Sequence, residues 1–536
     1  MAERWRPRIE LSTLEALIMS RLRRTRKLFA FLREYRNELF DDGFQAELER
    51  MYRDTGAGSE PKPPAQMAML LLFQAYVRAS DAEAVELTIM DRRWQMVLDR
   101  LNAEEPFCSQ GAIEAFRARM IKFEMDRRLL EKTAEIARRT HAFDPKKLPK
   151  SLRLAVDSMP LEGAGRVEDT FNLIAHAARK VAECAAMILE RTVETVCEDA
   201  RAPLLLATSV KRGLDIDWTD EEQKEVALNR LVRQVESLVK WVERKLGEAS
   251  QTPPLSEQIA TLEQILTQDL EPDPSGSRKR VREGVAPERV VSVEDTDMRH
   301  GRKSKTKLFN GFKRHIAADL DTGVIVVCTV TPANRPEAEA TAALKADLVH
   351  QGLRVSELHV DRGYIKSALV AETIAEGGEV ICKPWAGRNV LDFLFSKREF
   401  DVNVRRLTIR CPAGQTQPFR PGEVVEFEAE QCDRCRLRVH CTTAAPGRGR
   451  TVAMTTDEEL QDQLRRLQAT TKGRERMRER VAVEHNLAHV SQRQGRRARY
   501  RGVRKNVLDL RRVAAIQNLE NAQRRHALNS ELANAA

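Results

Sequence analysis

Two apolar runs of the chain each end in an aspartate, and this pattern constrains the fold more than any other feature. Residues 152–156 are followed by Asp157, and the run that ends at residue 360 is followed by Asp361. Short apolar runs of this kind predict buried β-strands. Side chains that follow parallel strands gather at one edge of a sheet. We therefore expect the two carboxylates to lie close together.

The sequence around these runs predicts a mixed sheet flanked by helices. Residues 1 to about 145 and 171–268 follow a helical period, whereas the period from residue 311 becomes that of strands. A hairpin turn at 321–323 is followed by a helix, the strand that carries Asp361, a second helix and a further strand. This order of elements is typical of the α+β or mixed class.

The helical segments contain specific start signals and buried faces. Ser80 and Glu83 have the spacing of a capping box, and a further helix is expected to begin near Ser109. This basic helical region fits a helix-turn-helix module and a plain helical bundle equally well. Apolar residues between 228 and 266 recur every three or four positions, which indicates a helical hairpin packed on itself or, alternatively, a coiled coil.

Composition favours an anionic partner. The 536 residues carry a formal net charge of +10, and such a basic balance is typical of proteins that bind nucleic acid. The apolar stretch 67–77 is shorter than the roughly 20 residues that cross a bilayer. The N-terminal segment has no apolar core of the signal-peptide type. We therefore expect a soluble, cytoplasmic protein with no membrane partner.

A third acid is expected on a helix near the end of the chain. Glu484 shares one predicted face with Val481, Leu487 and Ala488, and a carboxylate on such an apolar stripe is costly unless it meets a metal. Clustered carboxylates that offer only oxygen ligands are what Mg²⁺ prefers. The candidate catalytic and metal-binding residues are therefore Asp157, Asp361 and Glu484.

In this order and context, the three acids resemble those of the DDE transposases of bacterial insertion sequences. The local motifs are similar to the eleven-eighty-two branch, which is related to insertion sequence five. The similar stretches are DSMPLEGAGRVEDT, GRKSKTKLFNGFKRHIAADLDTG, DRGY, CPAG and RYRGVRKN, and they span most of the chain. The resemblance implies an RNase H-like catalytic core and an N-terminal helical region that binds DNA.

The resemblance also implies a function and its cofactors. The three acids would hold two Mg²⁺ or Mn²⁺ ions, which activate water or a 3′-hydroxyl for attack on a phosphodiester and stabilise the leaving oxygen. The protein would bind terminal inverted repeats, cut the ends and join them to target DNA as a homodimer in the nucleoid. Two alternatives are a catalytically inactive DNA-binding relative and an RNase H-like nuclease that does not transfer strands.

The region around the third acid departs from the family pattern. That pattern is tyrosine, two residues, arginine, three residues, glutamate, six residues and a basic residue. Arg480 and Glu484 keep this spacing, but Met477 stands at the tyrosine position and Ser491 at the basic position. Glu475 and Glu479 are therefore competing candidates for the third acid.

Four of the nine cysteines cluster near the second and third acids. They are Cys411, Cys432, Cys435 and Cys441. Two cysteines separated by two residues and flanked by two more fit a tetrahedral structural zinc site, with His440 as an alternative ligand to Cys441. Free thiols in a reduced cytoplasm are the alternative interpretation.

Basic residues are expected to contact the DNA backbone, which positions DNA without reading its sequence. The dense segment near the C-terminus contains Arg493, Arg496, Arg497, Arg499, Arg501, Arg504, Lys505, Arg511 and Arg512. A second group precedes the hairpin and contains Arg302, Lys303, Lys305 and Lys307. Arg480 is a further candidate, and Arg362 contacts a phosphate or forms a plain ion pair. A solvated basic helix is the alternative for the C-terminal segment.

These patterns divide the chain into six segments. They are a helical DNA-binding region (1–150), the first strand of the core (151–170), a helical insertion (171–294), the continued core (295–400), a cysteine insertion (401–450) and C-terminal helices with the third acid (451–536).

Overall fold

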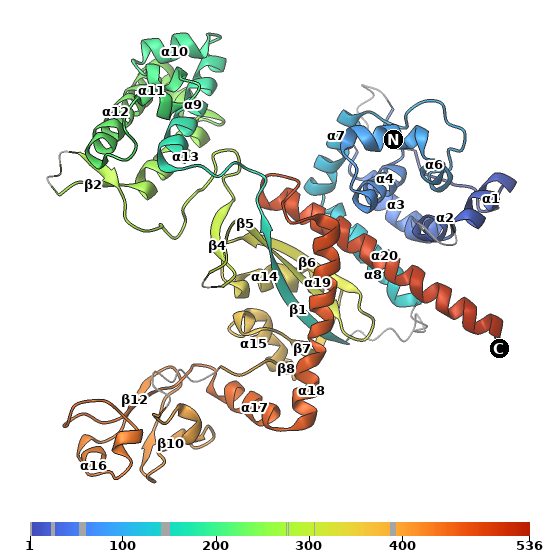
Figure 1. Ribbon diagram of the computed structural model, residues 1–536. Coiled ribbons are helices and arrows are strands. Elements are labelled where there is room, and N and C mark those ends of the chain that lie inside the picture. Colours follow the sequence, from blue (N-terminus) through green and yellow to red (C-terminus); the bar gives the residue numbers. More distant parts are fainter. Residues whose placement is uncertain are drawn as a thin grey trace.

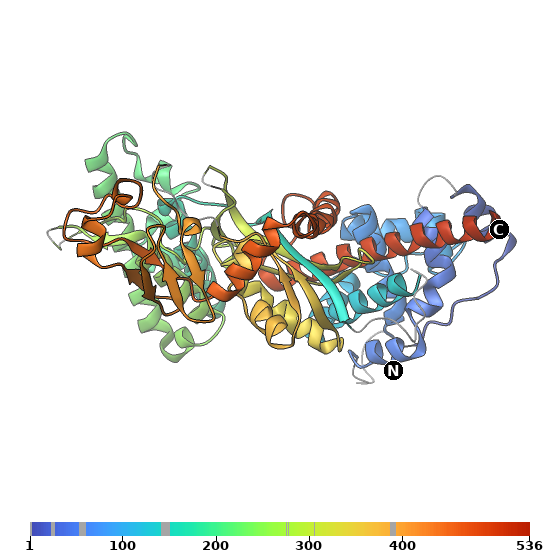
Figure 2. The same cartoon turned by 90° about the horizontal axis from the view of Figure 1, so that it is seen from below.

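A computed structural model describes residues 3–22, 27–52, 60–140, 151–274, 276, 278–304, 306–385 and 393–535. Its centre is a mixed sheet with helices on both sides, which confirms the predicted mixed α/β class (Figure 1). In Figure 2 the sheet lies between two ends of an elongated molecule. The N-terminal helices are at one end, and the helical unit at 170–269 and the cysteine region are at the other.

The central sheet has six strands. The strands are β1 (Ser151–Glu162), β4 (Arg299–Arg302), β5 (Leu308–Asp319), β6 (Ile325–Pro332), β7 (Arg354–His359) and β8 (Glu379–Ile381). Their order is β4-β5-β1-β7-β8, and β6 also pairs with β5. The pairs β1–β7 and β7–β8 are parallel, whereas β5 runs antiparallel to β1, β4 and β6.

Strand β1 is longer than the sequence predicts. The apolar run ends at residue 156, yet the strand continues through Asp157 to Glu162. The physical reason is that β5 supplies antiparallel partners along this whole length, from Leu154 opposite Asp319 to Glu162 opposite Gly311. Asp157 is therefore in the middle of β1, although it lies just past the part of β1 that pairs with β7.

The N-terminal region is helical, as expected. Its helices are α1 (Thr13–Arg21), α2 (Lys27–Leu39), α3 (Asp42–Glu49), α4 (Pro64–Val77), α5 (Asp81–Met90), α6 (Arg92–Val97), α7 (Gln110–Lys122) and α8 (Met125–Thr140). Ser80 and Glu83 form a reciprocal capping box at the start of α5. Ser109 caps α7, which buries Ile113, Phe116 and Met120. Both predicted helix starts are confirmed.

The C-terminal helix α20 (Val503–Ala535) joins the N-terminal helices to the sheet. It packs along α8 and β6 and also contacts α4 (Figure 1). The buried side chains of α20, the N-terminal helices and one face of β1, β5 and β6 belong to a single hydrophobic cluster. The other face of the sheet is covered by α14 (Ala340–His350), α15 (Ala368–Ala375) and α17 (Glu458–Ala469).

Two further units have hydrophobic cores of their own. One contains α9 (Thr170–Ile188), α10 (Val193–Asp199), α11 (Val210–Leu214), α12 (Glu221–Leu246) and α13 (Leu255–Asp269), followed by a hairpin of β2 (Leu270–Pro272) and β3 (Lys279–Val281). The periodic apolar residues of α12 and α13 are buried inside this unit, but both helices pack mainly on α9 and not on each other, so the predicted helical hairpin is not what forms.

The cysteine region is the other unit. It contains β9 (Asp401–Asn403), β10 (Thr408–Arg410), β11 (Thr416–Pro418), β12 (Val424–Glu426), α16 (Ala429–Asp433) and β13 (Thr451–Ala453) around a small apolar core. After α17, the helices α18 (Thr471–Glu479) and α19 (Val481–Gln494) lead the chain back along the sheet (Figure 1). No helix within the described ranges is both long and apolar enough to cross a membrane.

Candidate active site

The pairing of β1 with β7 brings Asp157 and Asp361 to the same edge of the sheet. The last parallel pair is Ala155 opposite His359, and each aspartate lies two residues further along the chain. The side chain of Asp157 is mostly buried, with 18% of its surface exposed. The two carboxylates that the sequence predicts as neighbours are therefore carried by β1 and by the segment that directly follows its parallel partner β7.

The residues after Asp361 form a short turn that is anchored in the core. The chain leaves β7 and enters a single 3₁₀ turn, Arg362–Tyr364. Tyr364 is fully buried, and its hydroxyl is 2.7 Å from Nδ1 of His315, whose Nε2 is 2.8 Å from the Thr331 hydroxyl. This buried network fixes the turn and thereby the backbone that carries Asp361.

Glu484 lies on α19 and is connected to Asp157 by an arginine side chain. Nη1 of Arg480 is 3.0 Å from Oδ2 of Asp157, and Nη2 of the same guanidinium donates to Oε1 of Glu484 at 2.6 Å. Arg480 is the residue between α18 and α19, so the junction of these helices positions it over β1. A single guanidinium therefore links the first and third predicted acids.

Glu484 does not lie on an apolar face of its helix, and this sequence prediction is wrong. The buried face of α19 consists of Val483, Leu487, Val490 and Gln494, while Val481 and Ala488 are exposed. Glu484 lies on the open side of the helix, with 46% of its side chain exposed. Glu484 and Ala488 each follow a buried position by one residue, which turns their side chains by about 100° away from the buried face.

The electrostatics of Asp157 reflect this arrangement. Burial raises the pKa of its carboxyl above the ordinary value, and the nearby carboxylates of Glu484 and Asp361 raise it further. Arg480 and the backbone N–H of Ser158 oppose this rise. Because like charges that share a site are costly, the three acids need compensating positive charge. In the described residues Arg480 supplies part of it.

A pocket of about 270 Å³ opens beside Asp361 and Glu484. It is lined by Val360, Asp361, Ile381, Cys382, Lys383, Gln468, Arg474, Met477, Arg478, Arg480, Val481 and Glu484. Acids therefore lie next to several cations in one concave site. Such a combination suits a phosphodiester, whose charge the cations neutralise while the carboxylates bind metal.

The three acids fit divalent cations in ligand type, because they offer only carboxylate oxygens. Their carboxylate oxygens do not all lie within 4.8 Å of one another. Within the described part of the chain, the group whose ligand atoms all lie within 4.8 Å of one another is Glu357, His359 and Glu479.

That closely spaced group is filled by arginines. Nη2 of Arg153 hydrogen-bonds to both Glu357 and Glu479. Arg476 donates to Glu357 at 2.6 Å and to Glu379 at 2.7 Å. These guanidiniums occupy the positions that a cation would take. Glu479, one competing third acid, therefore belongs to an ion-pair network that holds α18 on the sheet, and Glu475, the other, is exposed on α18.

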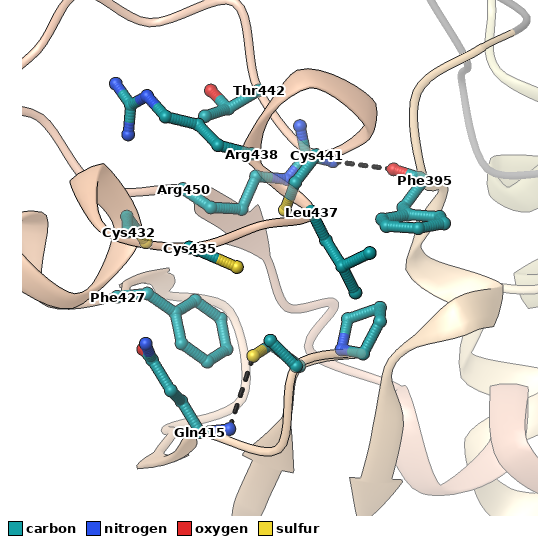
Figure 3. Close-up of a pocket in the computed structure, with 13 residues that line it drawn as sticks. Phe395, Gln415, Phe427, Cys432, Cys435, Leu437, Arg438, Cys441, Thr442 and Arg450 are labelled. Carbon is teal, nitrogen blue, oxygen red and sulfur yellow. Dashed lines mark hydrogen bonds between the residues drawn. The ribbon is translucent and has the colours of Figure 1, made fainter.

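The four clustered cysteines surround a small pocket in the cysteine region. Cys411, Cys432, Cys435 and Cys441 all line a cavity of about 20 Å³, together with Phe395 and Phe427 (Figure 3). A cavity of this size is large enough for one water molecule or ion. The backbone N–H of Gln415 donates to the Cys411 sulfur at 3.3 Å. Burial, and to a smaller extent the three other thiols, raise the pKa of Cys441.

The sulfur atoms are spread around this pocket. None of the described thiols belongs to a group of three ligand atoms within 4.8 Å of one another. Cys441 lines the pocket, whereas the His440 ring lies 6.3 Å from the Phe395 ring and is not part of the lining. Of the two alternative fourth ligands, the geometry therefore favours Cys441.

Most guanidiniums of the C-terminal basic segment have partners inside the protein. Arg493 pairs with Glu520, Arg504 with Asp126, and Arg501 with Glu294. Arg497 donates to the carbonyls of Gly163 and Ala164, and Arg499 donates to that of Ala79.

Arg511 and Arg512 are buried: Arg511 pairs with Asp126 and Asp347, and Arg512 pairs with Asp509. Only part of the positive charge of the C-terminal basic segment therefore faces solvent.

Other predicted DNA-contacting residues are exposed. Arg302, Lys303, Lys307 and Lys505 lie on the surface, and Arg496 is 83% exposed although it pairs with Glu162. Arg362 lies over the exposed ring of Trp385, 6.0 Å from its centroid, next to the pocket. Lys305 lies outside the described residues.

Glu337, which no sequence pattern predicts as a site residue, approaches the site from a 3₁₀ turn, Glu337–Glu339. Its Oε1 accepts a hydrogen bond from the Ser158 hydroxyl at 2.5 Å, directly beside Asp157. Glu337 is one of five glutamates between residues 337 and 376, so composition does not distinguish it.

One comparison with known proteins identifies a related family. Residues 409–522 match the family model described as a transposase DDE domain. The matched part contains the cysteine cluster and Glu484, but neither Asp157 nor Asp361. This match supports a DDE transposase. Searches of curated proteins and of solved structures return no match to the chain.

Proposed function

We propose that this protein is the transposase of an insertion sequence of the eleven-eighty-two branch, with an RNase H-like core. It binds the terminal inverted repeats of its element, cuts the DNA at the ends and joins them to a target as a homodimer. The observation that carries this function is the register of β1 and β7. This register sets Asp157 beside Asp361, and Arg480 ties Asp157 to Glu484.

In this function Asp157, Asp361 and Glu484 would hold two Mg²⁺ or Mn²⁺ ions. Such ions, when bound by carboxylates, lower the pKa of a water or hydroxyl nucleophile and stabilise the leaving oxygen of a phosphodiester. The chain's own residues provide the rest. Lys383, Arg474 and Arg478 line the pocket next to the acids and bind phosphate.

Arg480 holds the acids in place before the substrate arrives. Its guanidinium contacts Asp157 and Glu484 at once, so it offsets their mutual repulsion and orients Glu484 toward β1. The buried contact between Tyr364 and His315 anchors the turn that follows Asp361. A site mounted on strands and anchored turns keeps its geometry better than one on free loops.

The test is metal-dependent cleavage and joining of DNA that carries the inverted repeats flanking the gene. The wild-type protein should cut and join this DNA with Mg²⁺ or Mn²⁺, and Asp361→Ala should abolish both steps. Glu376→Ala is the matched control, because Glu376 is an exposed acid at the end of α15. Cleavage without joining would indicate a nuclease instead. Specific binding without cutting by any variant would indicate an inactive DNA-binding relative.

We further propose that Cys411, Cys432, Cys435 and Cys441 hold a structural Zn²⁺. Their common pocket and the N–H···S hydrogen bond to Cys411 support this ligand set. Metal analysis of the purified protein should find close to one zinc per chain, and Cys435→Ser should lower that amount. Less than about half an equivalent in the wild type would contradict the site.

A further inference from the structure

Glu337 touches the backbone segments of both aspartates. Its Oε1 accepts the hydrogen bond from Ser158, the residue after Asp157 on β1. Its other carboxylate oxygen packs against Gly363, the second residue after Asp361. The turns that contain Glu337 and Gly363 pack against each other. One carboxylate therefore lies between the two elements that carry the predicted metal ligands.

The contact with Glu337 leaves no room for a side chain at Gly363 of the DRGY segment unless the carboxylate moves. A Cβ at this position would overlap the Glu337 carboxylate, whose Cδ would be only 3.1 Å away. The backbone of Gly363 does not have a positive φ, so conformation alone does not demand glycine. A side chain at this position would therefore require the Glu337 carboxylate to move.

Tyr364 lies close to Glu337 and to both aspartates. Tyr364 is buried beneath the turn, and burial raises the pKa of its phenol well above the ordinary value. The charges of Glu337, Asp157 and Asp361 add to that rise, which shows that all three acids lie near the same hydroxyl. Asp361 lines the pocket, whereas Glu337 and Asp157 do not.

We propose that Glu337 is a positioning residue that fixes Asp157 and Asp361 relative to each other, through the Ser158 hydroxyl on one side and the Gly363 backbone on the other. This inference rests on the proposed function, because it concerns the metal ligands of the same site. Groups that orient metal ligands typically change metal affinity by about 10–100-fold when they are removed.

The first test measures Mn²⁺ binding to the full-length protein without DNA, by electron paramagnetic resonance of the free ion. Glu337→Ala and Ser158→Ala should each weaken binding by about tenfold or more. Glu337→Gln should keep most of the affinity, because its amide oxygen still accepts from Ser158. The matched control is Glu339→Ala, two residues along the same turn and exposed.

The outcomes separate the inference from the function beneath it. The inference would be overturned if the Glu337→Ala and Ser158→Ala variants bound Mn²⁺ as tightly as the Glu339→Ala control. It would also be overturned if Glu337→Gln lost as much Mn²⁺ affinity as Asp361→Ala, because Glu337 would then be a direct metal ligand. A wild-type protein that neither binds Mn²⁺ nor cuts DNA would instead contradict the proposed function. Thermal unfolding of each variant identifies any that fail to fold.

A second test addresses the contact at Gly363 itself. Gly363→Ala should weaken Mn²⁺ binding, because the added methyl group displaces the carboxylate or the turn. Combining it with Glu337→Ala removes the overlap, so the double variant should bind no more weakly than Glu337→Ala alone. Strictly additive losses in the double variant would show that the two residues do not interact, and would overturn the contact.

Discussion

The acidic centre and the C-terminal basic segment both carry dense charge, but they use it in opposite ways. Asp157 and Glu484 share one guanidinium, and the pocket beside Asp361 is open. In residues 493–512, by contrast, Arg504, Arg511 and other arginines pair with carboxylates inside the protein. The first region keeps its charge available for a ligand, whereas the second uses its charge to join parts of the fold.

This difference teaches that charge density in a sequence does not reveal what the charges face. The basic segment crosses from α19 to α20, and its arginines reach α8, α14 and the loop before β4. A buried pair stabilises little when complete, but removing one partner leaves an uncompensated charge. The N-terminal helices and the sheet are therefore held together partly by arginines that sequence density alone suggests for DNA.

The largest expected effect is on the acidic centre. Asp157→Asn should reduce DNA cleavage by at least about a thousandfold, equivalent to about 4 kcal/mol of activation free energy. Burial raises the Asp157 pKa, so the ionised carboxylate is slightly unfavourable to the folded state at pH 7. The free energy of unfolding should therefore change by less than about 1 kcal/mol. Cleavage assays and urea denaturation measure the two effects, and a large loss of stability would break the comparison.

The next effect is on the stability of the basic segment. Arg511→Met should lower the free energy of unfolding by about 3 kcal/mol, because Asp126 and Asp347 lose a buried partner. Lys505→Met is the matched control on the same helix, since Lys505 is exposed and should change stability by less than about 0.5 kcal/mol. Urea denaturation measures both, and equal losses would show that burial of the guanidinium is irrelevant.

A smaller effect is the pH dependence of stability due to Asp295, which contacts the residue before α20. Burial raises the pKa of Asp295 to about 6, although the carboxylate accepts from the Gly502 N–H. The folded state thus binds this proton more tightly than the unfolded chain, whose pKa is near 4, so stability should fall as pH rises from about 4 to 6. The loss is about 2 kcal/mol relative to Asp295→Asn. The prediction would be contradicted if the free energies of unfolding of the wild type and Asp295→Asn, measured by denaturation, differed by the same amount at every pH in this range.

The smallest effect concerns the exposed cations. Lys307→Ala should weaken binding to the terminal DNA several-fold and reduce the slope of log affinity against log salt by about 1, because one phosphate contact is lost. Arg493→Ala should leave the slope unchanged, since Arg493 already pairs with Glu520. Fluorescence anisotropy at several salt concentrations measures both variants. A reduced slope for Arg493→Ala would show that its internal pair opens on DNA.

Local patterns predicted many elements of the fold. The alternating and apolar runs led to β5, β6 and β7, and the capping residues Ser80 and Ser109 marked the starts of α5 and α7. Such features depend on neighbours within a few residues, which the sequence displays directly. The end of β1 was misjudged, because its length depends on β5, which is more than 140 residues away in the sequence.

The sequence by itself determined the mixed α/β class, the two strands that carry Asp157 and Asp361, and the cysteines that line one pocket. Only the tertiary structure decided that Arg480 joins Asp157 to Glu484, that Glu337 contacts Ser158 and Gly363, and that the basic segment pairs with distant acids. The physical reason is that hydrogen bonds and ion pairs act over a few ångströms in space. Chain folding, and not sequence distance, sets which charges come that close.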